Sequence, residues 1–248
     1  MSTRIAVFSD IHGNCVALDA VLADIAAANV DQMVCLGDAI QGGPQPVETV
    51  ERLRGLGCPI VMGNADDWLN SGADSGAETT TEKQRVVREW QLSLLSEADR
   101  AFIATFQPTV ELPLDDGRTL LCFHGSPASY DDVILPDMPN DDFKAMLGTY
   151  SGRALCGGHT HMQQVRRLGP LFFFNPGSVG VAVDQYQPED NFYLDPWAEY
   201  AILTSDGPTI SLEFRRIPFD VDALAKAYHA NGRPYADSNI AMYRRPEA

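Results

Sequence analysis

Residues 5–13 read Ile-Ala-Val-Phe-Ser-Asp-Ile-His-Gly, a short apolar run that ends directly in a carboxylate, a histidine and a glycine. The same arrangement recurs along the chain. Each time, a run of strand-favouring residues is followed at once by a side chain that can bind a metal ion, usually with glycine beside it. The further instances are Gln32–Leu36 before Gly37-Asp38, Pro59–Met62 before Gly63-Asn64, Thr119–Phe123 before His124-Gly125, and Ala154–Cys156 before Gly157-Gly158-His159-Thr160-His161.

The segments between the first three runs have helical patterns. Cys15–Ala28 has apolar residues at helical spacing, and Val47–Leu56 repeats the pattern. Short, continuous apolar runs are typical of strands that are covered on both faces. The chain is therefore predicted to open as β-α-β-α-β, with the polar residues beyond the carboxyl ends of the strands, where open sheets bind ligands.

Each polar residue, taken singly, has an ordinary structural explanation. An isolated aspartate is more often a helix cap, a lone histidine is more often a hydrogen-bonded residue at the edge of the core, and asparagine is common in turns. Four of the five histidines, however, fall at predicted strand ends together with two carboxylates and an amide, whereas His229 falls in a polar C-terminal helix. This convergence predicts one metal site made of Asp10, His12, Asp38, Asn64, His124, His159 and His161.

Composition restricts the class of protein. The chain has 248 residues, of which 45% are hydrophobic, and this length suits a single domain over residues 1–248. With 18 basic and 34 acidic residues, the net charge of -16 disfavours stable binding to nucleic acid or to an anionic membrane. No apolar run approaches the roughly 20 residues that span a bilayer, and we see no signal peptide, so we expect a cytoplasmic protein. Five cysteines without paired spacing are expected to be reduced core residues.

The five motifs, in their order, resemble those of the calcineurin-like metallophosphoesterases. Two longer stretches strengthen the resemblance to the compact bacterial and archaeal branch of predicted phosphodiesterases and phosphatases. These stretches are Gly37-Asp-Ala-Ile-Gln-Gly-Gly-Pro44 and Asn175-Pro-Gly-Ser-Val-Gly180. The resemblance extends over about residues 4–218 and implies an α/β fold of four layers, an α-β-β-α sandwich with two mixed sheets flanked by helices.

The resemblance also implies a role for each ligand. One divalent ion would be held by Asp10, His12 and His161, and a second by Asn64, His124 and His159. Asp38 would bridge both ions, and a bridging hydroxide would attack phosphorus, with Asp38, Asn64 and His124 counted as catalytic residues as well as ligands. Oxygen and imidazole ligands suit Mn, Fe, Zn, Ni or Co, of which we favour manganese.

The sequence departs from this family at positions that would help a phosphate monoester to react. Many members have a histidine after the asparagine ligand and an arginine after the Gly-Asp motif, where this chain has Ala65 and Gln41. Places that are often basic in relatives are Ala128, Met162 and Ala182 here. Asp66 and Asp67 are candidate replacement acids, but solvated carboxylates at the start of a helix are the more ordinary interpretation.

We therefore expect a small phosphate-ester substrate, either a phosphodiester or a monoester with a good leaving group. The alternatives are a phosphomonoesterase acting on nucleotides or phosphoproteins, and a metal-binding sensor or scaffold with little turnover. The oligomeric state stays open.

Three segments lie outside the motifs. A helical segment at about residues 67–106, beside the site, is either a lid or structural filler. Val183–Trp197 is rich in acidic and aromatic residues and forms either a ligand-stacking rim, a dimer contact or plain loop packing. A short helix is expected at Asp220–Ala230, and the tail from Arg233 onward has no readable pattern.

Overall fold

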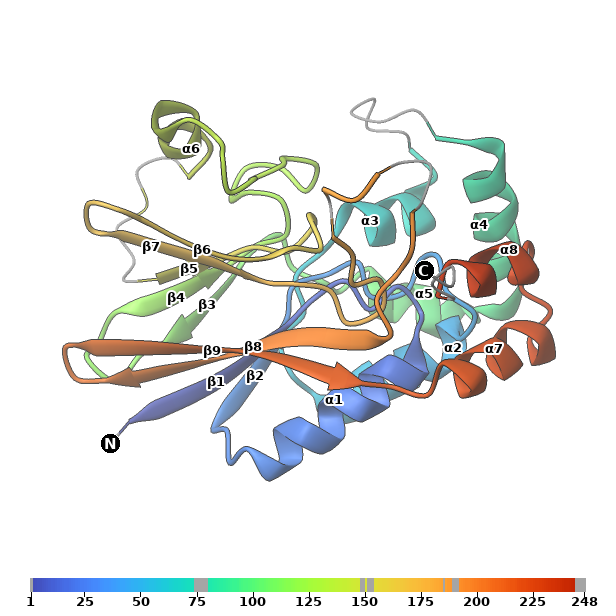
Figure 1. Ribbon diagram of the computed structural model, residues 1–248, viewed down its shortest axis with the longest axis horizontal. Coiled ribbons are helices and arrows are strands. Elements are labelled where there is room, and N and C mark those ends of the chain that lie inside the picture. The colour runs from blue at the N-terminus through green and yellow to red at the C-terminus, as the bar shows by residue number, and fades with distance from the viewer. Residues whose placement is uncertain are drawn as a thin grey trace.

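Two mixed β-sheets face each other in the computed structural model, which describes residues 2–73, 80–147, 150, 154–184, 186–188 and 192–243 (Figure 1). The first sheet has the strand order β2-β1-β8-β9, and the second has the order β3-β4-β5-β7-β6. The strands are β1 (Thr3–Phe8), β2 (Gln32–Cys35), β3 (Val110–Pro113), β4 (Thr119–Cys122), β5 (Ala154–Cys156), β6 (Gln163–Leu168), β7 (Leu171–Pro176), β8 (Trp197–Asp206) and β9 (Thr209–Pro218).

Parallel pairing fixes where the loops after the strands lie. β1 runs parallel to β2, with Val7 opposite Val34, and β4 runs parallel to β5, with Leu121 opposite Leu155. Because parallel strands end at the same edge of a sheet, the loops that follow these four strands gather at one end of the sandwich. Six of the seven predicted metal ligands are in these loops.

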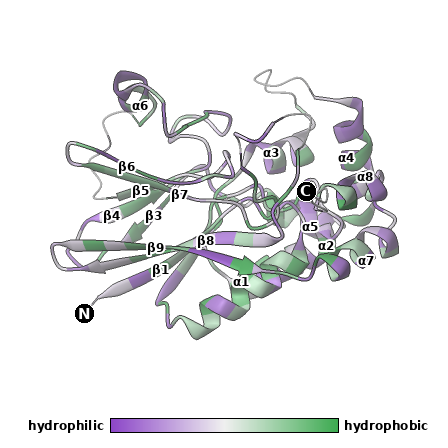
Figure 2. Cartoon of the chain, in the orientation of Figure 1, coloured by the Kyte–Doolittle hydropathy of each residue, from purple (hydrophilic) through white to green (hydrophobic). Residues whose placement is uncertain are grey.

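Apolar side chains fill the space between the sheets. Val7 and Val34 of the first sheet and Leu120 and Phe174 of the second belong to one buried cluster. Hydrophobic residues run along the strands of both sheets in Figure 2. Central strands such as β1 and β5 are apolar on both faces because helices cover the outer face of each sheet, whereas the edge strands β6 and β9 are partly polar and exposed.

The helices complete the predicted four-layer α-β-β-α sandwich. On the first sheet, α1 packs against β8 and β9. On the second, Phe143 and Leu147 of α6 pack against Phe173 of β7. The helices are α1 (Cys15–Ala27), α2 (Pro46–Leu56), α3 (Asn64–Ser71), α4 (Glu82–Leu94), α5 (Glu97–Ile103), α6 (Asn140–Leu147), α7 (Val221–Ala230) and α8 (Ala236–Ala241).

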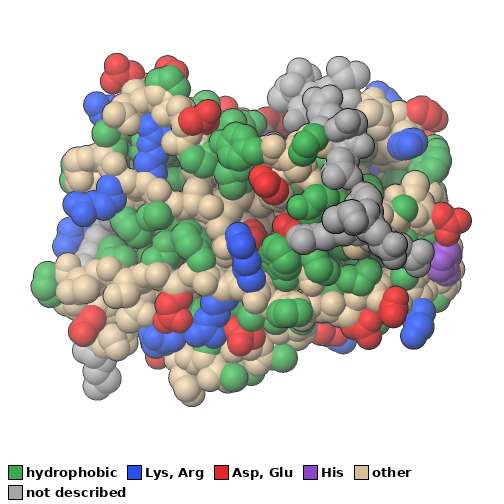
Figure 3. All heavy atoms as spheres, in the orientation of Figure 1, with side chains coloured by type: hydrophobic (Ala, Val, Ile, Leu, Met, Phe, Trp, Pro, Cys, Tyr) green, Lys and Arg blue, Asp and Glu red, His purple; other side chains and the backbone are tan. Residues whose placement is uncertain are grey.

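Two properties of the surface and helices bear on binding partners. None of the helices within the described ranges has both the length and the apolar character needed to cross a membrane. On the face drawn in Figure 3, Lys and Arg side chains are scattered among Asp and Glu side chains.

The prediction of a regular strand at Pro59–Met62 is wrong. Only two isolated bridges form there, one from Ile60 to Cys35 of β2 and one from Val61 to Gln107. Pro59 has no backbone N–H to donate, which shortens the ladder on that side. The segment still lies beside β2, because the Val61 N–H donates to the Cys35 carbonyl at 2.9 Å.

The C-terminal region holds more structure than its sequence suggested. The expected helix at Asp220–Ala230 is confirmed as α7, with the Asp220 side chain accepting from the Ala223 N–H as N-cap. Beyond it, α8 forms where we saw no readable pattern, and the Asn231 side chain donates to the Pro44 carbonyl at 2.9 Å. The last five residues, 244–248, lie outside the described residues, as do parts of 67–106 and Val183–Trp197.

Candidate metal centre

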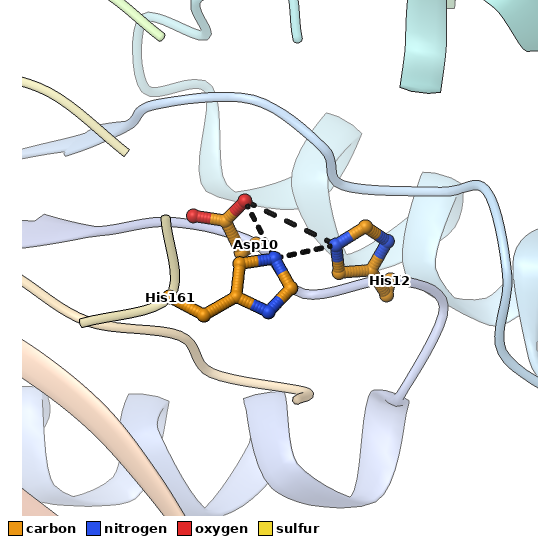
Figure 4. Close-up of side chains that lie close together, drawn as sticks. All are labelled: Asp10, His12 and His161. Atoms are coloured by element: carbon orange, nitrogen blue, oxygen red, sulfur yellow. Dashed lines mark hydrogen bonds and ion pairs between the residues drawn. The ribbon is translucent and has the colours of Figure 1, made fainter. Parts of the chain in front are cut away.

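The first group of predicted ligands is Asp10, His12 and His161, which come from the loop after β1 and the loop after β5. One ligand atom from each lies within 4.8 Å of the others. The Nε2 atoms of His12 and His161 are 3.1 Å apart, and Asp10 Oδ1 lies 3.2 Å from His161 Nε2 (Figure 4). The three side chains point toward one another, as a shared ion requires.

Backbone carbonyls orient the two imidazoles of this group. His12 Nδ1 lies 2.8 Å from the Gln41 carbonyl oxygen, and His161 Nδ1 lies 3.0 Å from the Val181 carbonyl oxygen. A carbonyl can only accept, so each Nδ1 must hold the proton that is donated. In the neutral rings, both Nε2 atoms then present lone pairs to each other, which favours a cation between them.

The second group is Asp38, His124 and His159, again with ligand atoms within 4.8 Å of one another. The His124 ring has the same arrangement, since its Nδ1 lies 2.8 Å from the Leu36 carbonyl oxygen. Its Nε2 lies 3.1 Å from Asn64 Oδ1, so the amide predicted as a ligand joins this group. The rings of His124 and His159 have centroids 5.1 Å apart.

Asp38 lies between the two groups. Its Oδ2 is 3.4 Å from His124 Nε2 and 3.8 Å from His12 Nε2. Its Oδ1 accepts the backbone N–H of Ala65 at 2.8 Å. The carboxylate therefore faces both groups at once.

Burial and neighbouring charges shift the pKa values of these side chains in opposite directions. Burial alone raises the pKa of both Asp10 and Asp38, but the histidines that face them outweigh burial, and both pKa values lie below their ordinary range. Burial lowers the pKa of His12 and His159. For His124 burial also acts downward, yet the Asp38 charge outweighs it and raises the pKa to about 9. Both aspartates thus stay ionised at neutral pH, the form in which a carboxylate binds a cation.

The backbone is strained at most of these residues. Five of the seven predicted ligands have positive φ angles: Asp10 (55°), His12 (47°), Asp38 (48°), His159 (68°) and His161 (56°). Positive φ is uncommon outside glycine and is tolerated where the surroundings fix the chain. Gly63 illustrates how tight the packing is, because a Cβ at this position would overlap the Asp38 carboxylate. Glycine here lets the two loops approach closely.

These residues fit divalent metal ions. Asp10 Oδ1 is buried and has no hydrogen-bond partner, which is costly unless a cation or proton satisfies it. Imidazole nitrogens, carboxylate oxygens and an amide oxygen, without thiolate, form a donor set suited to several divalent first-row metals. All seven predicted ligands are brought together, whereas His229 lies on α7 near Asp237.

Two buried residues that support this centre were not identified from the sequence. The Asp66 carboxylate accepts the backbone N–H groups of Ala39 and Ile40 at 2.8 and 2.9 Å. The interpretation of Asp66 as a solvated carboxylate is therefore wrong, although Asp67 is exposed. The spacing of Asp66 to the buried Leu69, three residues on, is the signal that places its side chain on the inner face of α3.

Gln91 of α4 is the second such residue. Its side chain accepts from the Gly42 N–H at 3.1 Å and donates to the Ile40 carbonyl at 3.0 Å. This contact gives the expected helical segment at 67–106 a defined structural effect, which is to brace the loop that follows Asp38. Whether the segment also acts as a lid stays a prediction.

The positions that depart from the family pattern offer no replacement acid or base. Ala65 contributes a backbone N–H to Asp38, and Gln41 is buried, with its carbonyl facing His12. The Ser126 and Ser178 hydroxyls are engaged in loop hydrogen bonds, to Asp132 and to the Asp10 carbonyl respectively.

Comparisons with known proteins agree with this geometry. The chain is 28% identical over 245 residues to the uncharacterized protein MJ0912 of Methanocaldococcus jannaschii, covering 92% of this chain and 91% of that protein. It is 25% identical over 181 residues to phosphodiesterase YfcE of Escherichia coli, covering 70% of this chain and 77% of YfcE. A crystal structure of a metallophosphoesterase from Sphaerobacter thermophilus superimposes with a TM-score of 0.69 at 26% identity, covering 97% of this chain and 98% of that one.

The family profile described as "Calcineurin-like phosphoesterase superfamily domain" matches residues 3–194. This range contains all seven predicted ligands and ends before α7 and α8. The fold, the facing ligand groups and the profile lead to one conclusion: the chain belongs to the calcineurin-like phosphoesterase superfamily and is a metal-dependent hydrolase of phosphoester bonds.

Proposed function

We propose that the centre binds two divalent ions and hydrolyses phosphodiesters in preference to monoesters. The position of Asp38 is the observation that carries the dinuclear assignment, because its Oδ2 faces His12 of one group and His124 of the other. Asp10, His12 and His161 would hold one ion, and Asn64, His124 and His159 the other. Manganese is our favoured metal, supported by a donor set of oxygen and nitrogen without thiolate.

Two such ions supply Lewis acidity at the phosphoryl oxygens and a nucleophile derived from water at neutral pH. The protein's own contribution is to hold the ligands before the ions bind. Carbonyls of Gln41, Leu36 and Val181 accept from Nδ1 of three imidazoles, so Nε2 is the atom that would bind an ion once any proton on it is released. Preorganisation of this kind avoids rearrangement during the reaction.

The preference for diesters rests on groups that the centre lacks. A histidine at position 65 would be placed to donate a proton to a leaving group, and an alanine cannot do so. A diester carries one negative charge on its phosphate and asks for less charge neutralisation than a monoester. The relative named phosphodiesterase YfcE supports the same choice.

Metal content and rates on paired aryl esters test the proposal. We expect about two manganese equivalents per chain and a higher kcat/KM for bis-p-nitrophenyl phosphate than for p-nitrophenyl phosphate. In Ala65→His, the ratio of these two kcat/KM values should shift toward the monoester by about tenfold or more, since a placed acid contributes roughly 100-fold or more to catalysis.

Each other outcome has its own meaning. An unchanged ratio in Ala65→His would contradict the reason given for diester preference. A wild-type preference for the monoester would favour the phosphomonoesterase, and two bound ions without hydrolysis of either ester would favour a metal-binding sensor or scaffold.

A further inference from the structure

A cavity of about 240 Å³ opens beside the first ligand group. His12 and His161 line it on one side, together with Val181 of the loop after β7. Tyr228 and Met242 of the C-terminal region line the cavity as well. Figure 1 shows α7 and α8 at the same end of the molecule as the loops that hold the ligands.

Hydrogen bonds attach the C-terminal wall of this cavity to the metal-binding loops. Tyr243 Oη donates to the Gly180 carbonyl at 2.8 Å, and Gly180 in turn donates its N–H to the Asp10 carbonyl at 2.9 Å. The Leu194 N–H donates to the Met242 carbonyl at 2.8 Å. The wall is therefore held at a fixed position relative to the first ligand group.

The lining is mostly apolar and aromatic. Val181, Leu194 and Met242 contribute aliphatic or thioether surface, and Tyr228 and Tyr243 contribute aromatic surface. The polar side chain of Asn14, which also lines the cavity, is already engaged, because it donates to the Gly180 carbonyl and accepts from the Ala17 N–H. Contact with an apolar, flat group is the interaction that this surface offers.

A buried cationic side chain, that of Arg233, lines the cavity. Arg233 is 9% exposed, and its Nε and Nη2 donate to the Gly42 carbonyl at 3.0 and 2.6 Å. Its guanidinium carbon lies 5.5 Å from the centroid of the Tyr228 ring. Among the residues that the structure describes, it forms no ion pair with a carboxylate, although the protein has a net charge of -16. The Nη1 atom donates to the Pro234 carbonyl at 2.6 Å, so about two of the five guanidinium N–H groups are left for acceptor atoms of a ligand.

We propose that this cavity binds one organic substituent of the phosphodiester, a single flat ring system with acceptor atoms at its edge, the chemical class that includes nucleobases. The inference rests on the proposed function, since the phosphate would lie at the adjoining ligand groups. The volume is below the range typical of drug-sized ligands, which limits the substituent to one ring system. Much of this wall lies beyond residue 194, outside the matched family domain, so it can set specificity without changing the metal centre.

Two esters with the same leaving group test the inference. The p-nitrophenyl ester of thymidine 5′-phosphate carries a nucleobase, and methyl p-nitrophenyl phosphate carries only a methyl group. We expect the ratio of their kcat/KM values to be about ten or more in the wild type, because apolar pocket contacts discriminate by roughly 10- to 200-fold. Met242→Trp, which fills the cavity, should lower this ratio about tenfold. Ala241→Trp is the matched control, because Ala241 is the last residue of α8, next to the C-cap Met242, is exposed and does not line the cavity.

Thymidine itself provides a measurement that needs no hydrolysis. Saturation-transfer NMR on chelator-treated protein should show transfer to the thymine protons in the wild type and in Ala241→Trp, and loss of transfer in Met242→Trp. A wild-type ratio near one, or no transfer to thymine in the wild type, overturns the inference whether or not Met242→Trp folds. Absence of hydrolysis of both esters with added manganese would instead contradict the proposed function, and the NMR result would still decide whether the cavity binds a ring.

Discussion

The two ligand groups are built from similar side chains but lie in different surroundings. His12 and His161 have side chains that are 14% and 16% exposed, and both border the cavity formed with α7 and α8. His124 is fully buried, and the Asp66 carboxylate accepts a backbone N–H from the loop that follows Asp38. We call Asp38, Asn64, His124 and His159 the deeper group after the buried His124, although His159 and Asn64 are half-buried, and Asp10, His12 and His161 the outer group. The deeper group is braced by residues inside the matched family domain, whereas the outer group faces a wall that lies partly outside it. The difference separates ligands held within the matched family domain from a neighbouring wall that, in our proposal, selects the substrate.

Asp38→Asn should have the largest effect, because this carboxylate faces both groups. We expect kcat/KM on bis-p-nitrophenyl phosphate to fall by about 100-fold or more, since even residues that only support metal ligands are worth roughly 10- to 100-fold. Metal content measured by plasma mass spectrometry should fall for both ions. Asp19→Asn, at an exposed carboxylate on α1, is the control and should behave as the wild type. Activity within threefold of the wild type in Asp38→Asn would mean that Asp38 does not join the two groups.

His161→Ala separates the groups, because it removes a ligand of the outer group alone. About one metal equivalent should be lost, and the other should remain at His124, His159 and Asn64. His229→Ala, at an exposed histidine of α7, is the matched control. Loss of both ions from His161→Ala would show that the two groups bind metal as one unit, which would remove the distinction drawn between them.

Asp66→Asn tests whether the loop that follows Asp38 depends on the two backbone hydrogen bonds that Asp66 accepts from it. The amide can accept only one of the two N–H groups that Asp66 now accepts, and its own NH₂ would face the other. Burial raises the pKa of Asp66 to about 7, so its negative charge is not fully developed at neutral pH. We expect the free energy of unfolding, from urea denaturation at pH 7, to fall by about 2 kcal/mol, because one buried backbone N–H loses its acceptor. Asp67→Asn, one residue away and exposed, should change it by about 0.5 kcal/mol or less. Equal effects in the two variants would contradict a specific brace.

Glu199 provides the corresponding test for the outer group, because its carboxylate packs so closely against Gly177, in the loop that contacts Asp10 through Ser178, that a Cβ at Gly177 would overlap it. Burial raises the pKa of Glu199 from 4.5 to about 6, although Arg216 acts in the opposite direction. The folded protein therefore binds this proton more tightly than the unfolded chain does. The resulting stability is complete below pH 4.5 and is lost as the pH rises through about 6, a change of about 2 kcal/mol.

The measurement is the free energy of unfolding of metal-free protein at pH 4 and at pH 8. Glu199→Gln should lack the 2 kcal/mol component of the pH dependence estimated from the shift. Glu213→Gln, at a carboxylate whose side chain is 45% exposed, should retain it. The same pH dependence in Glu199→Gln as in the wild type would show that burial of this carboxylate does not contribute to it.

The local sequence was sufficient to predict the ligands, but it was not sufficient to predict the residues that hold the ligand loops in place. Each predicted ligand lies shortly after a short apolar run, so residue type and position could be recognised together. Asp66 and Asp67 are adjacent and chemically identical, and only the packing of α3 distinguishes the buried one from the exposed one. Gln91 and Arg233 contact the loop around Gly42 from positions about 50 and 190 residues away in the chain, and no local pattern records such contacts.

The resemblance of the sequence to a known family implied the two-sheet fold, and the sequence pattern by itself predicted that the seven candidate ligands converge. It could do so because parallel strands place their carboxyl ends at one edge, which turns a repeated local pattern into a shared location. Only the tertiary structure decided that Pro59–Met62 forms bridges rather than a strand, and that α8 and Arg233 close a cavity beside His12 and His161. These features depend on contacts between distant segments, whose free energy comes from burial and from hydrogen bonds that exist only once the chain has folded.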